Sequence, residues 1–195
     1  MSLLTLEKVM KRPALARDAT NPDRWKVVEE QLGTGLPEDY KGFLEAFGIG
    51  TINSFLVVLA PQSSIQHVDL LKRGRSELEA YKASKMESPK YYHDDVYPTP
   101  GGILPFAVTD NGEVLYWRTV GGPEQWTVTI YESRGPEKFD FNGNMTEFLA
   151  AILTGEIECD VLPRGFSKSP PAFEPIKLPS VLAQELVNRF REGIS

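Results

Sequence analysis

One dipeptide limits the possible folds of this chain more than any other feature. Asn111-Gly112 separates two runs of strand-forming residues that together span 103–118. Asn-Gly is the favoured pair for a two-residue type I′ turn, because both central residues must tolerate positive φ. The sequence therefore predicts an antiparallel β-hairpin. The pairs expected to share its core-facing side are Asp110 with Glu113, Val108 with Leu115, and Phe106 with Trp117.

Other segments predict further strands and helices. Clusters of β-branched and aromatic residues predict strands at 52–59, 126–131 and 139–141. In the strictly alternating run 126–131, the residues expected to face inward are Trp126, Val128 and Ile130, and those expected outward are Thr127, Thr129 and Tyr131. Helical spacing and capping residues predict helices after Asn21, after Pro37, over 63–85, after Asn144 and after Ser180.

The order of these segments indicates the fold class. Helices that precede a run of neighbouring strands favour an α+β fold over a wound parallel sheet. We expect a mostly antiparallel sheet of about four to six strands, with helices packed around it in a single domain. The chain of 195 residues suits one domain with flanking segments. We assign residues 1–21 to an N-terminal segment, 22–160 to the domain, and 161–195 to a Pro-rich tail with a peripheral C-terminal helix.

The residues that usually carry chemistry are scarce. Cys159 is the single cysteine and His67 and His93 are the two histidines, so neither an internal disulfide nor a Cys/His metal cage is expected. The sequence has no Gly-x-Ser-x-Gly elbow, phosphate-binding glycine loop or Cys-x-x-Cys pair. We therefore expect no enzymatic activity, no catalytic site and no cofactor. The cluster His93-Asp94-Asp95 is the one candidate for a metal site.

Acidic residues are concentrated in one part of the chain. The net charge is −6, and residues 110–160 hold ten acidic and three basic side chains, so this segment carries −7 and the remainder +1. Such a segment disfavours nucleic acid as a partner and would steer a basic protein toward it, although an acidic face can also serve solubility alone. The N-terminus lacks the apolar core of a signal peptide, so we expect a cytoplasmic protein without a membrane segment.

Three segments, taken in order, resemble the SUKH superfamily. They are residues 35–44 (GLPEDYKGFL), residues 104–117 with the central Asp-Asn-Gly-Glu, and residues 145–149 (MTEFL). The superfamily comprises Smi/Knr-type fungal cell-wall regulators and many bacterial immunity proteins. The resemblance covers roughly residues 22–160; it departs at 48–50, where the family often has Asn-Gly-Gly, and in the Pro-rich tail. It implies a protein-binding domain without a shared catalytic apparatus.

The resemblance and the acidic segment together lead to one hypothesis. The protein is expected to be an immunity protein that neutralises a cognate toxin of the nuclease or deaminase type, which would carry a basic surface. On this hypothesis, acidic side chains steer the partner and outward aromatic side chains anchor it. The residues predicted to bind the partner are Glu113, Tyr116, Glu124, Tyr131, Glu132 and Asp140.

Two alternatives remain open at this point. The first is a scaffold or regulatory adaptor of the cell-wall-regulator kind, which would recruit a partner through the Pro-rich tail or through residues 88–102. The second is a hydrolase or metal enzyme that uses His93, Asp94 and Asp95. It would require bound metal that is lost when all three residues are replaced by alanine.

Overall fold

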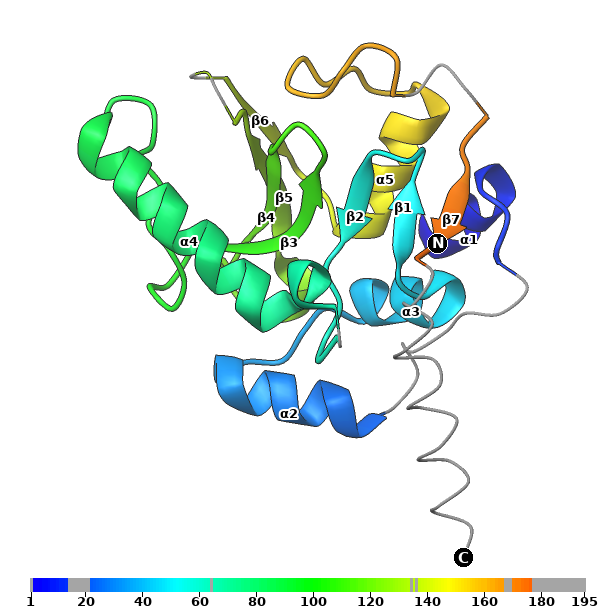
Figure 1. Cartoon of the computed structure of the whole chain (residues 1–195), viewed down its shortest axis with the longest axis horizontal. Helices are drawn as coiled ribbons and strands as arrows, with labels where there is room; N and C mark the ends of the chain where they lie inside the picture. Colours follow the sequence, from blue (N-terminus) through cyan, green and yellow to red (C-terminus); the bar gives the residue numbers. More distant parts are fainter. Residues whose placement is uncertain are drawn as a thin grey trace, which may run out of the picture.

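The predicted hairpin forms the centre of a β-sheet. The computed structural model describes residues 2–13, 22–63, 65–133, 135, 137–166 and 170–176. In these residues, strands pair antiparallel in the order β6-β5-β4-β3-β2-β1-β7 (Figure 1). The strands are β1 (Gly50–Ile52), β2 (Leu56–Val58), β3 (Ile103–Thr109), β4 (Val114–Arg118), β5 (Thr127–Tyr131), β6 (Lys138–Phe141) and β7 (Phe173–Pro175). The α+β prediction is confirmed, with seven strands rather than the expected four to six.

Helices cover both faces of this sheet. The described helices are α1 (Ser2–Val9), α2 (Pro22–Leu32), α3 (Glu38–Phe47), α4 (Leu70–Glu87) and α5 (Met145–Thr154), with short 3₁₀ turns η1 (Gln66–Val68) and η2 (Pro123–Gln125). The predicted helix over 63–85 is divided, because Asp69 accepts a hydrogen bond from the Lys72 N–H (2.8 Å) and begins α4 there. The helix predicted after Asn144 is α5, and Asn144 and Glu147 form a capping box at its start. None of the described helices is long and apolar enough to cross a membrane.

The central turn has three residues rather than two. Val108 pairs with Val114 instead of Leu115, and the Gly112 N–H donates to the Thr109 carbonyl (3.1 Å). Gly112 has a φ of 95°, whereas Asn111 is not among the residues with positive φ. These features describe a type I turn followed by a glycine bulge, not the predicted type I′ turn. The Glu113 N–H also donates to the Thr109 hydroxyl (3.0 Å), which stabilises the longer loop.

A second irregularity shifts the register of β3 and β4 by one further residue. The pairing of β3 with β4 slips between Pro105 and Ala107, so Phe106 is the extra residue of a β-bulge. Beyond this bulge, Leu104 lies opposite Trp117. The Phe106 and Trp117 rings are 5.0 Å apart, so the contact predicted for them forms although their pairing is different.

The predicted strand at 52–59 is instead a second hairpin. β1 and β2 are joined by a turn in which Asn53 and Ser54 both have a φ of 52°, and the Phe55 N–H donates to the Ile52 carbonyl (3.1 Å). Two successive residues with positive φ are what a type I′ turn requires. The Asn53 side chain fixes this turn, because it donates to the Phe166 carbonyl (2.7 Å) and accepts from the Ala172 N–H (2.8 Å).

Both flanking segments contact the central part of the chain. In α1, Leu6 is fully buried, and this helix packs against α5. In β7, which pairs with β1, the Phe173 ring lies 5.4 Å from the Phe47 ring of α3. The helix predicted after Ser180 and the cap predicted at Asn21 lie outside the described residues.

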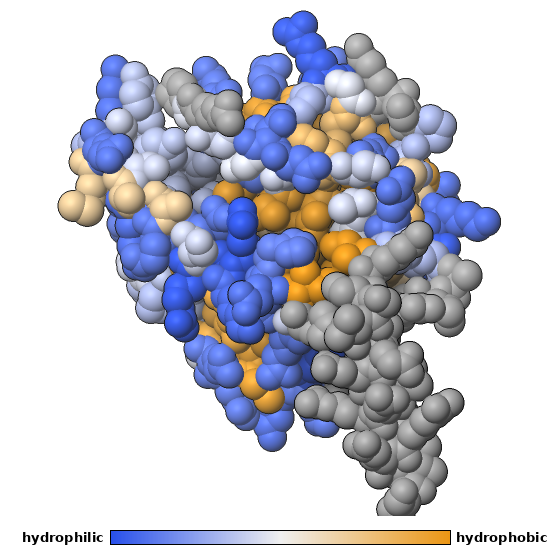
Figure 2. All heavy atoms as spheres, viewed as in Figure 1, coloured by the Kyte–Doolittle hydropathy of each residue, from blue (hydrophilic) through white to orange (hydrophobic). Residues whose placement is uncertain are grey.

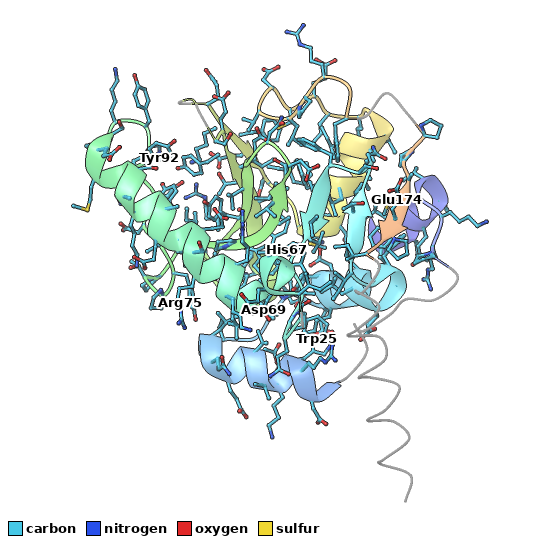
Figure 3. All side chains as sticks on the ribbon, viewed as in Figure 1. Trp25, His67, Asp69, Arg75, Tyr92 and Glu174 are labelled. Carbon is cyan, nitrogen blue, oxygen red and sulfur yellow. The ribbon has the colours of Figure 1, made fainter. Side chains whose placement is uncertain are left out.

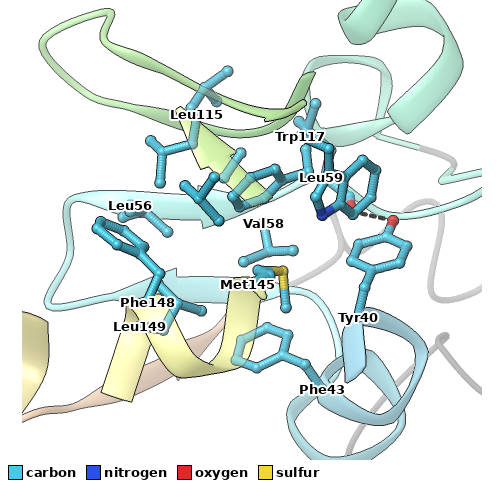
Figure 4. Packing of buried hydrophobic residues seen from close by; sticks show 14 of the residues in the cluster. Tyr40, Phe43, Leu56, Val58, Leu59, Leu115, Trp117, Met145, Phe148 and Leu149 are labelled. Carbon is cyan, nitrogen blue, oxygen red and sulfur yellow. Dashed lines mark hydrogen bonds between the residues drawn. The ribbon is translucent and has the colours of Figure 1, made fainter. Parts of the chain in front are cut away.

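The two faces of the sheet bury different kinds of side chain. Along β4, Leu115 and Trp117 point to the side where α3 and α5 pack, as Figure 4 shows. On this side, Tyr40 donates its hydroxyl to the Leu59 carbonyl (2.6 Å) and contacts the Trp117 ring edge to face at 4.9 Å. Tyr116 points to the opposite side, where its ring lies 5.9 Å from that of Tyr81 on α4. The segment around Tyr40, from which the family resemblance began, thus builds the core.

Candidate functional site

The six residues predicted to bind a partner do not form one surface. Tyr116, Tyr131 and Asp140 belong to the α4 side of the sheet. Glu113 and Glu132 lie at the end of the sheet that carries the 110–112 turn, and Glu124 lies on η2. The six residues therefore fall in three separate regions of the molecule.

The prediction that Tyr116 and Tyr131 point into solvent is wrong. Their exposures are 3% and 4%, because α4 and the loop that follows it cover this side of the sheet. Tyr81 of α4 packs against both rings, and Tyr92 of the loop stacks on Tyr131 at 5.6 Å. Figure 3 labels Tyr92 beside the far end of α4. In this arrangement a partner protein cannot touch either tyrosine.

Beneath α4, these tyrosines surround a buried ion-pair cluster. Asp94 is 8% exposed, and its carboxylate accepts from both terminal nitrogens of the Arg118 guanidinium (2.8 and 3.1 Å). It also accepts from the Tyr131 hydroxyl (2.5 Å) and pairs with the Lys138 ammonium (3.1 Å). The Asp94 N–H donates to the Tyr81 hydroxyl (3.1 Å). We call these five residues, Tyr81, Asp94, Arg118, Tyr131 and Lys138, the Asp94 cluster.

The electrostatics of the cluster follow from its contacts. Burial would raise the pKa of Asp94, but hydrogen bonds from Arg118, Tyr131 and Lys138 outweigh it and hold that pKa well below its usual range. Burial and the neighbouring Asp94 carboxylate raise the pKa of Tyr131 far above its usual value. Asp94 is therefore ionised and Tyr131 protonated at neutral pH. The cluster joins loop 88–102 to β4, β5 and β6.

This geometry bears on the metal-site alternative. His93 and Asp95 are exposed. Asp95 pairs with Lys85 of α4 (2.9 Å), whereas Asp94 pairs with Arg118 and Lys138. Both oxygens of Asp94 already accept hydrogen bonds from cations or hydroxyls. Within the described ranges, no group of three or more His, Cys, Asp or Glu side chains is placed to hold a metal ion. The three residues therefore do not converge on one point.

The remaining predicted residues differ in accessibility. Glu113 is 5% exposed, and both its N–H and its carboxylate bond to the Thr109 hydroxyl, so it stabilises the turn. Glu124 is exposed, and it accepts from the Glu38 N–H (2.9 Å) at the first turn of α3. Asp140 is exposed and pairs with Arg118 and Lys138 at the edge of the Asp94 cluster. Glu132 is half-buried in the loop between β5 and β6.

Four loops meet at one end of the sheet. The Asp110 N–H donates to the Phe55 carbonyl (3.0 Å), and the Ser133 hydroxyl donates to the Asn111 carbonyl (2.9 Å). The Phe55 ring lies 5.7 Å from that of Phe166. These contacts join the turns at 53–55 and 110–112 to the loops at 132–137 and 155–166, which lie together at the top of Figure 1.

This end of the sheet is acidic. Its exposed or half-buried carboxylates are Asp110, Glu132, Glu137, Glu156, Glu158 and Asp160. No ion pair joins any of the six to another residue in the part of the chain that the structure describes. Among the described residues of these loops, Arg164 is the basic one. In the sequence, the loop between β5 and β6 also contains Arg134. We call this region the acidic loop surface.

Two adjoining hollows indent the acidic loop surface. One has a volume of about 390 Å³ and is lined in part by Glu158, Asp160 and Arg164. The other has a volume of about 380 Å³ and shares Pro163 and Phe166 with the first. Cys159 lines the first hollow, but burial raises the pKa of its thiol, which opposes the reactive thiolate form. The hollows suit side chains of a partner rather than thiol chemistry.

Sequence reasoning missed two of these features. It weighed Asp94 as a metal ligand and did not connect it with Arg118 or Lys138, because nothing in the local pattern pairs residues so far apart. It also left Glu158 and Asp160 out of the predicted binding residues, although both contributed to the acidic count for 110–160. That count was the signal in the sequence that could have drawn attention to these two residues.

Comparison with known proteins agrees with the family suggested by the sequence. The SUKH_6 family model, described as SMI1-KNR4 cell-wall, matches residues 22–149, which is more than half of the chain. The matched span runs from the start of α2 into α5 and contains the Asp94 cluster. It ends before Glu156, Glu158 and Asp160. No curated protein and no solved structure matches the chain.

Proposed function

The chain belongs to the SUKH superfamily of SMI1-KNR4 proteins, and on this premise we propose that it is an immunity protein that binds a toxin with a basic surface. The toxin is a nuclease or deaminase, whose substrate-binding surface is basic because it must attract phosphates. The protein acts by occluding that surface. It carries out no chemistry in this role.

The observation that carries this proposal is the acidic loop surface. Six carboxylates from separate parts of the segment 110–160 lie on loops that the fold joins at one end of the sheet. Unpaired surface carboxylates of one sign accelerate the encounter with a basic partner. They are also available for new ion pairs in the complex, because none is ion-paired with another described residue.

The hollow beside Glu158 and Asp160 supplies a site for an anchoring residue. Aromatic and arginine side chains in pockets usually dominate the energy of an interface. A hollow of about 390 Å³ with two carboxylates in its lining fits an arginine side chain of the toxin. Of the predicted residues, Glu132 lies on the acidic loop surface, where it is half-buried. Glu124 and Asp140 lie elsewhere and are proposed only as outer steering charges.

The test is rescue of growth by the full chain. A host strain expresses the toxin encoded beside this gene, together with either the wild-type protein or the charge-reversal variant Glu158→Lys/Asp160→Lys. We expect the wild-type protein to restore growth and the variant to fail. The dissociation constant of the complex should increase by about 100-fold, since two interfacial charge pairs are reversed. Calorimetry on the purified pair measures it.

A matched control tests whether the position of a reversed charge matters, and not only the change in net charge. Glu87 is exposed at the end of α4, outside the acidic loop surface, and has no ion pair in the described residues. Glu87→Lys should rescue growth as the wild type does. Equal rescue by the double variant would refute the proposed surface. Failure of the wild-type protein to rescue against any toxin of its genome would refute the immunity function itself.

A cell-wall adaptor is the second candidate, because the matching family model is described as SMI1-KNR4 cell-wall. Of the two segments first considered for recruitment, loop 88–102 is fixed to the sheet by Asp94. The Pro-rich tail lies partly outside the described residues. Cell-wall defects in a deletion strain that lacks any neighbouring toxin gene would favour this function over immunity.

A further inference from the structure

A groove runs between α2 and α4, away from the acidic loop surface. Two adjoining hollows of about 300 and 470 Å³ make up the groove, and both are lined by Gln31, Leu71 and Arg75. Leu32 of α2 and Leu78 of α4 line the smaller hollow, with Leu104 of β3. In Figure 2, apolar spheres are visible between hydrophilic ones in the lower part of this view. We call this feature the α2–α4 groove.

The α4 wall has the pattern of a helix face that lacks a partner. Leu71, Arg75, Leu78 and Lys82 recur at positions i, i+4, i+7 and i+11, which places them on one side of the helix. Leu71 and Leu78 are only half-buried. Although α4 has 18 residues, its buried ones are Leu70, Gly74 and Tyr81. The face toward the groove therefore keeps apolar area in contact with solvent.

A glycine keeps this groove open. Gly74 lies in the interior of α4 and lines the smaller hollow. Its φ is not positive, and a Cβ added there would meet no other atom within 4 Å. Glycine destabilises a helix interior relative to alanine. Neither the backbone conformation nor the packing requires it here, so its effect is to leave space in the groove.

The rim of the groove is basic. Lys72 and Arg75 are exposed, and neither forms an ion pair with a described residue. Figure 3 shows Arg75 on the side of α4 that is nearest to α2. Of the other charged residues in the lining, Lys82 is paired with Glu79 (2.8 Å), and Asp69 caps α4 through the Lys72 N–H. Lys72 and Arg75 are therefore the cations of the lining that have no ion pair among the described residues, and the five charged side chains of the lining sum to +1.

We propose that the α2–α4 groove binds the apolar face of an acidic amphipathic helix supplied by a second protein. Apolar side chains at i, i+3, i+4 and i+7 of such a helix would pack on Leu32, Leu71 and Leu78. Its close approach to α4 uses the space at Gly74, and its carboxylates pair with Lys72 and Arg75. This surface shares no residue with the acidic loop surface and has the opposite charge. It is therefore a second docking site, independent of the proposed toxin site.

Designed peptides test this proposal with the full chain. The probe is a fluorescein-labelled peptide of about 18 residues, with leucines at helical spacing and glutamates on the opposite face. A second peptide replaces the glutamates with lysines, and a third scrambles the order. Fluorescence anisotropy should show the acidic peptide binding at least about tenfold more tightly than either of the others. Amide chemical-shift changes should fall on α2 and α4.

Variants locate the binding in the groove. Lys72→Glu/Arg75→Glu should weaken binding of the acidic peptide by about tenfold. Lys26→Glu is the matched control, because Lys26 is exposed on α2 but does not line either hollow. It should change the affinity by less than about twofold. Gly74→Leu fills the groove and should abolish binding, while Gly74→Ala, measured by thermal unfolding, should be more stable than the wild type.

Several results would overturn the proposal. Absence of saturable binding by the acidic peptide up to about 1 mM is one. Equal binding of the acidic and lysine peptides is another. Unchanged affinity of a folded Gly74→Leu variant, or chemical-shift changes confined to the loops at 110–112 and 155–166, would place the peptide outside the groove. None of these results depends on whether a toxin binds the acidic loop surface.

Discussion

The sheet separates two interiors of different chemistry. On the side of α3 and α5, Trp117, Tyr40 and Phe148 are buried among aliphatic side chains. On the side of α4, the sheet buries a carboxylate and a layer of tyrosines, and the two cations that pair with the carboxylate are half-buried. Adjacent residues of β4 point into the two interiors, with Trp117 on one side and Arg118 on the other.

The two interiors should respond differently to pH. Burial of apolar area does not depend on pH, and its loss creates a cavity. An ion-pair cluster depends on the ionisation of its members, and removal of one member leaves the others uncompensated. The α4 interior should therefore be the part of the fold that acid weakens first. The predictions below test this contrast, beginning with the largest effect.

Trp117→Ala should have the largest effect. Its side chain is 1% exposed and contacts Phe106, Tyr40 and Trp126. Truncation of a buried aromatic residue lowers the free energy of unfolding by about 3–5 kcal/mol. Urea unfolding followed by far-UV circular dichroism measures it, and the loss should be the same at pH 5 and pH 8. Val120→Ala, at a residue that is 58% exposed, is the control and should cost less than about 0.5 kcal/mol.

Asp94→Asn should destabilise the protein by about 2–3 kcal/mol at pH 7. Removing one partner of a fully buried ion pair costs about 3–5 kcal/mol, but Arg118 and Lys138 also contact Asp140 and are partly solvated. The substitution removes the negative charge of Asp94, with which both Arg118 and Lys138 pair. Urea unfolding of the two proteins gives the difference.

The pH dependence of that difference follows from the lowered pKa of Asp94. Its contribution to stability is fully present above the unfolded-state pKa of about 4 and is lost as the pH falls below that value. The gap between wild type and Asp94→Asn should therefore shrink from about pH 5 downward. A gap that stays constant to pH 3 would contradict the assigned electrostatics and leave Asp94 a merely steric role.

Tyr131→Phe should have a smaller effect, about 1–1.5 kcal/mol. It removes the hydroxyl that donates to Asp94 (2.5 Å) but keeps the ring that packs on Tyr81 and Tyr92. A double-mutant cycle with Asp94→Asn checks the cause. We expect a clearly smaller cost of Tyr131→Phe when Asp94 is absent. Strictly additive effects would mean that the hydroxyl acts independently of the carboxylate.

Asp140→Asn should have the smallest effect, below about 0.5 kcal/mol. Asp140 pairs with the same two cations as Asp94, but its side chain is 58% exposed, so solvent and salt screen the interaction. Any loss should disappear in about 1 M NaCl. A loss as large as that of Asp94→Asn would show that burial does not distinguish the two carboxylates.

Local patterns in the sequence predicted much of the scaffold. Helical spacing after Pro37 predicted α3, whose buried face is Tyr40, Phe43, Leu44 and Phe47, and capping at Asn144 predicted the start of α5. The alternation at 126–131 placed Trp126, Val128 and Ile130 in the core. These features depend on residues within a few positions of one another, so propensity and periodicity suffice to find them. The count of charges in 110–160 identified an acidic segment, but not which of its carboxylates lie together on one surface.

Turn geometry was harder to predict, because contacts of residues outside the central pair decide between similar local conformations. Asn111-Gly112 was expected to form the type I′ turn, yet Thr109 and Glu113 stabilise a longer loop. Asn53-Ser54 was expected to continue a strand. Its two positive φ angles persist because the Asn53 side chain bonds to the backbone of Phe166 and Ala172, more than 100 residues away in sequence.

The sequence by itself determined that β4 and β5 have two chemically different faces, because side chains alternate along any strand. Only the tertiary structure decided that the more polar of these faces is also an interior. Tyr116 and Tyr131 were assigned to solvent because they alternate along their strands with the residues expected in the core. The structure buries them beneath α4, because Asp94, which lies on a loop, brings that loop and α4 over the sheet and pairs with Arg118, 24 residues away.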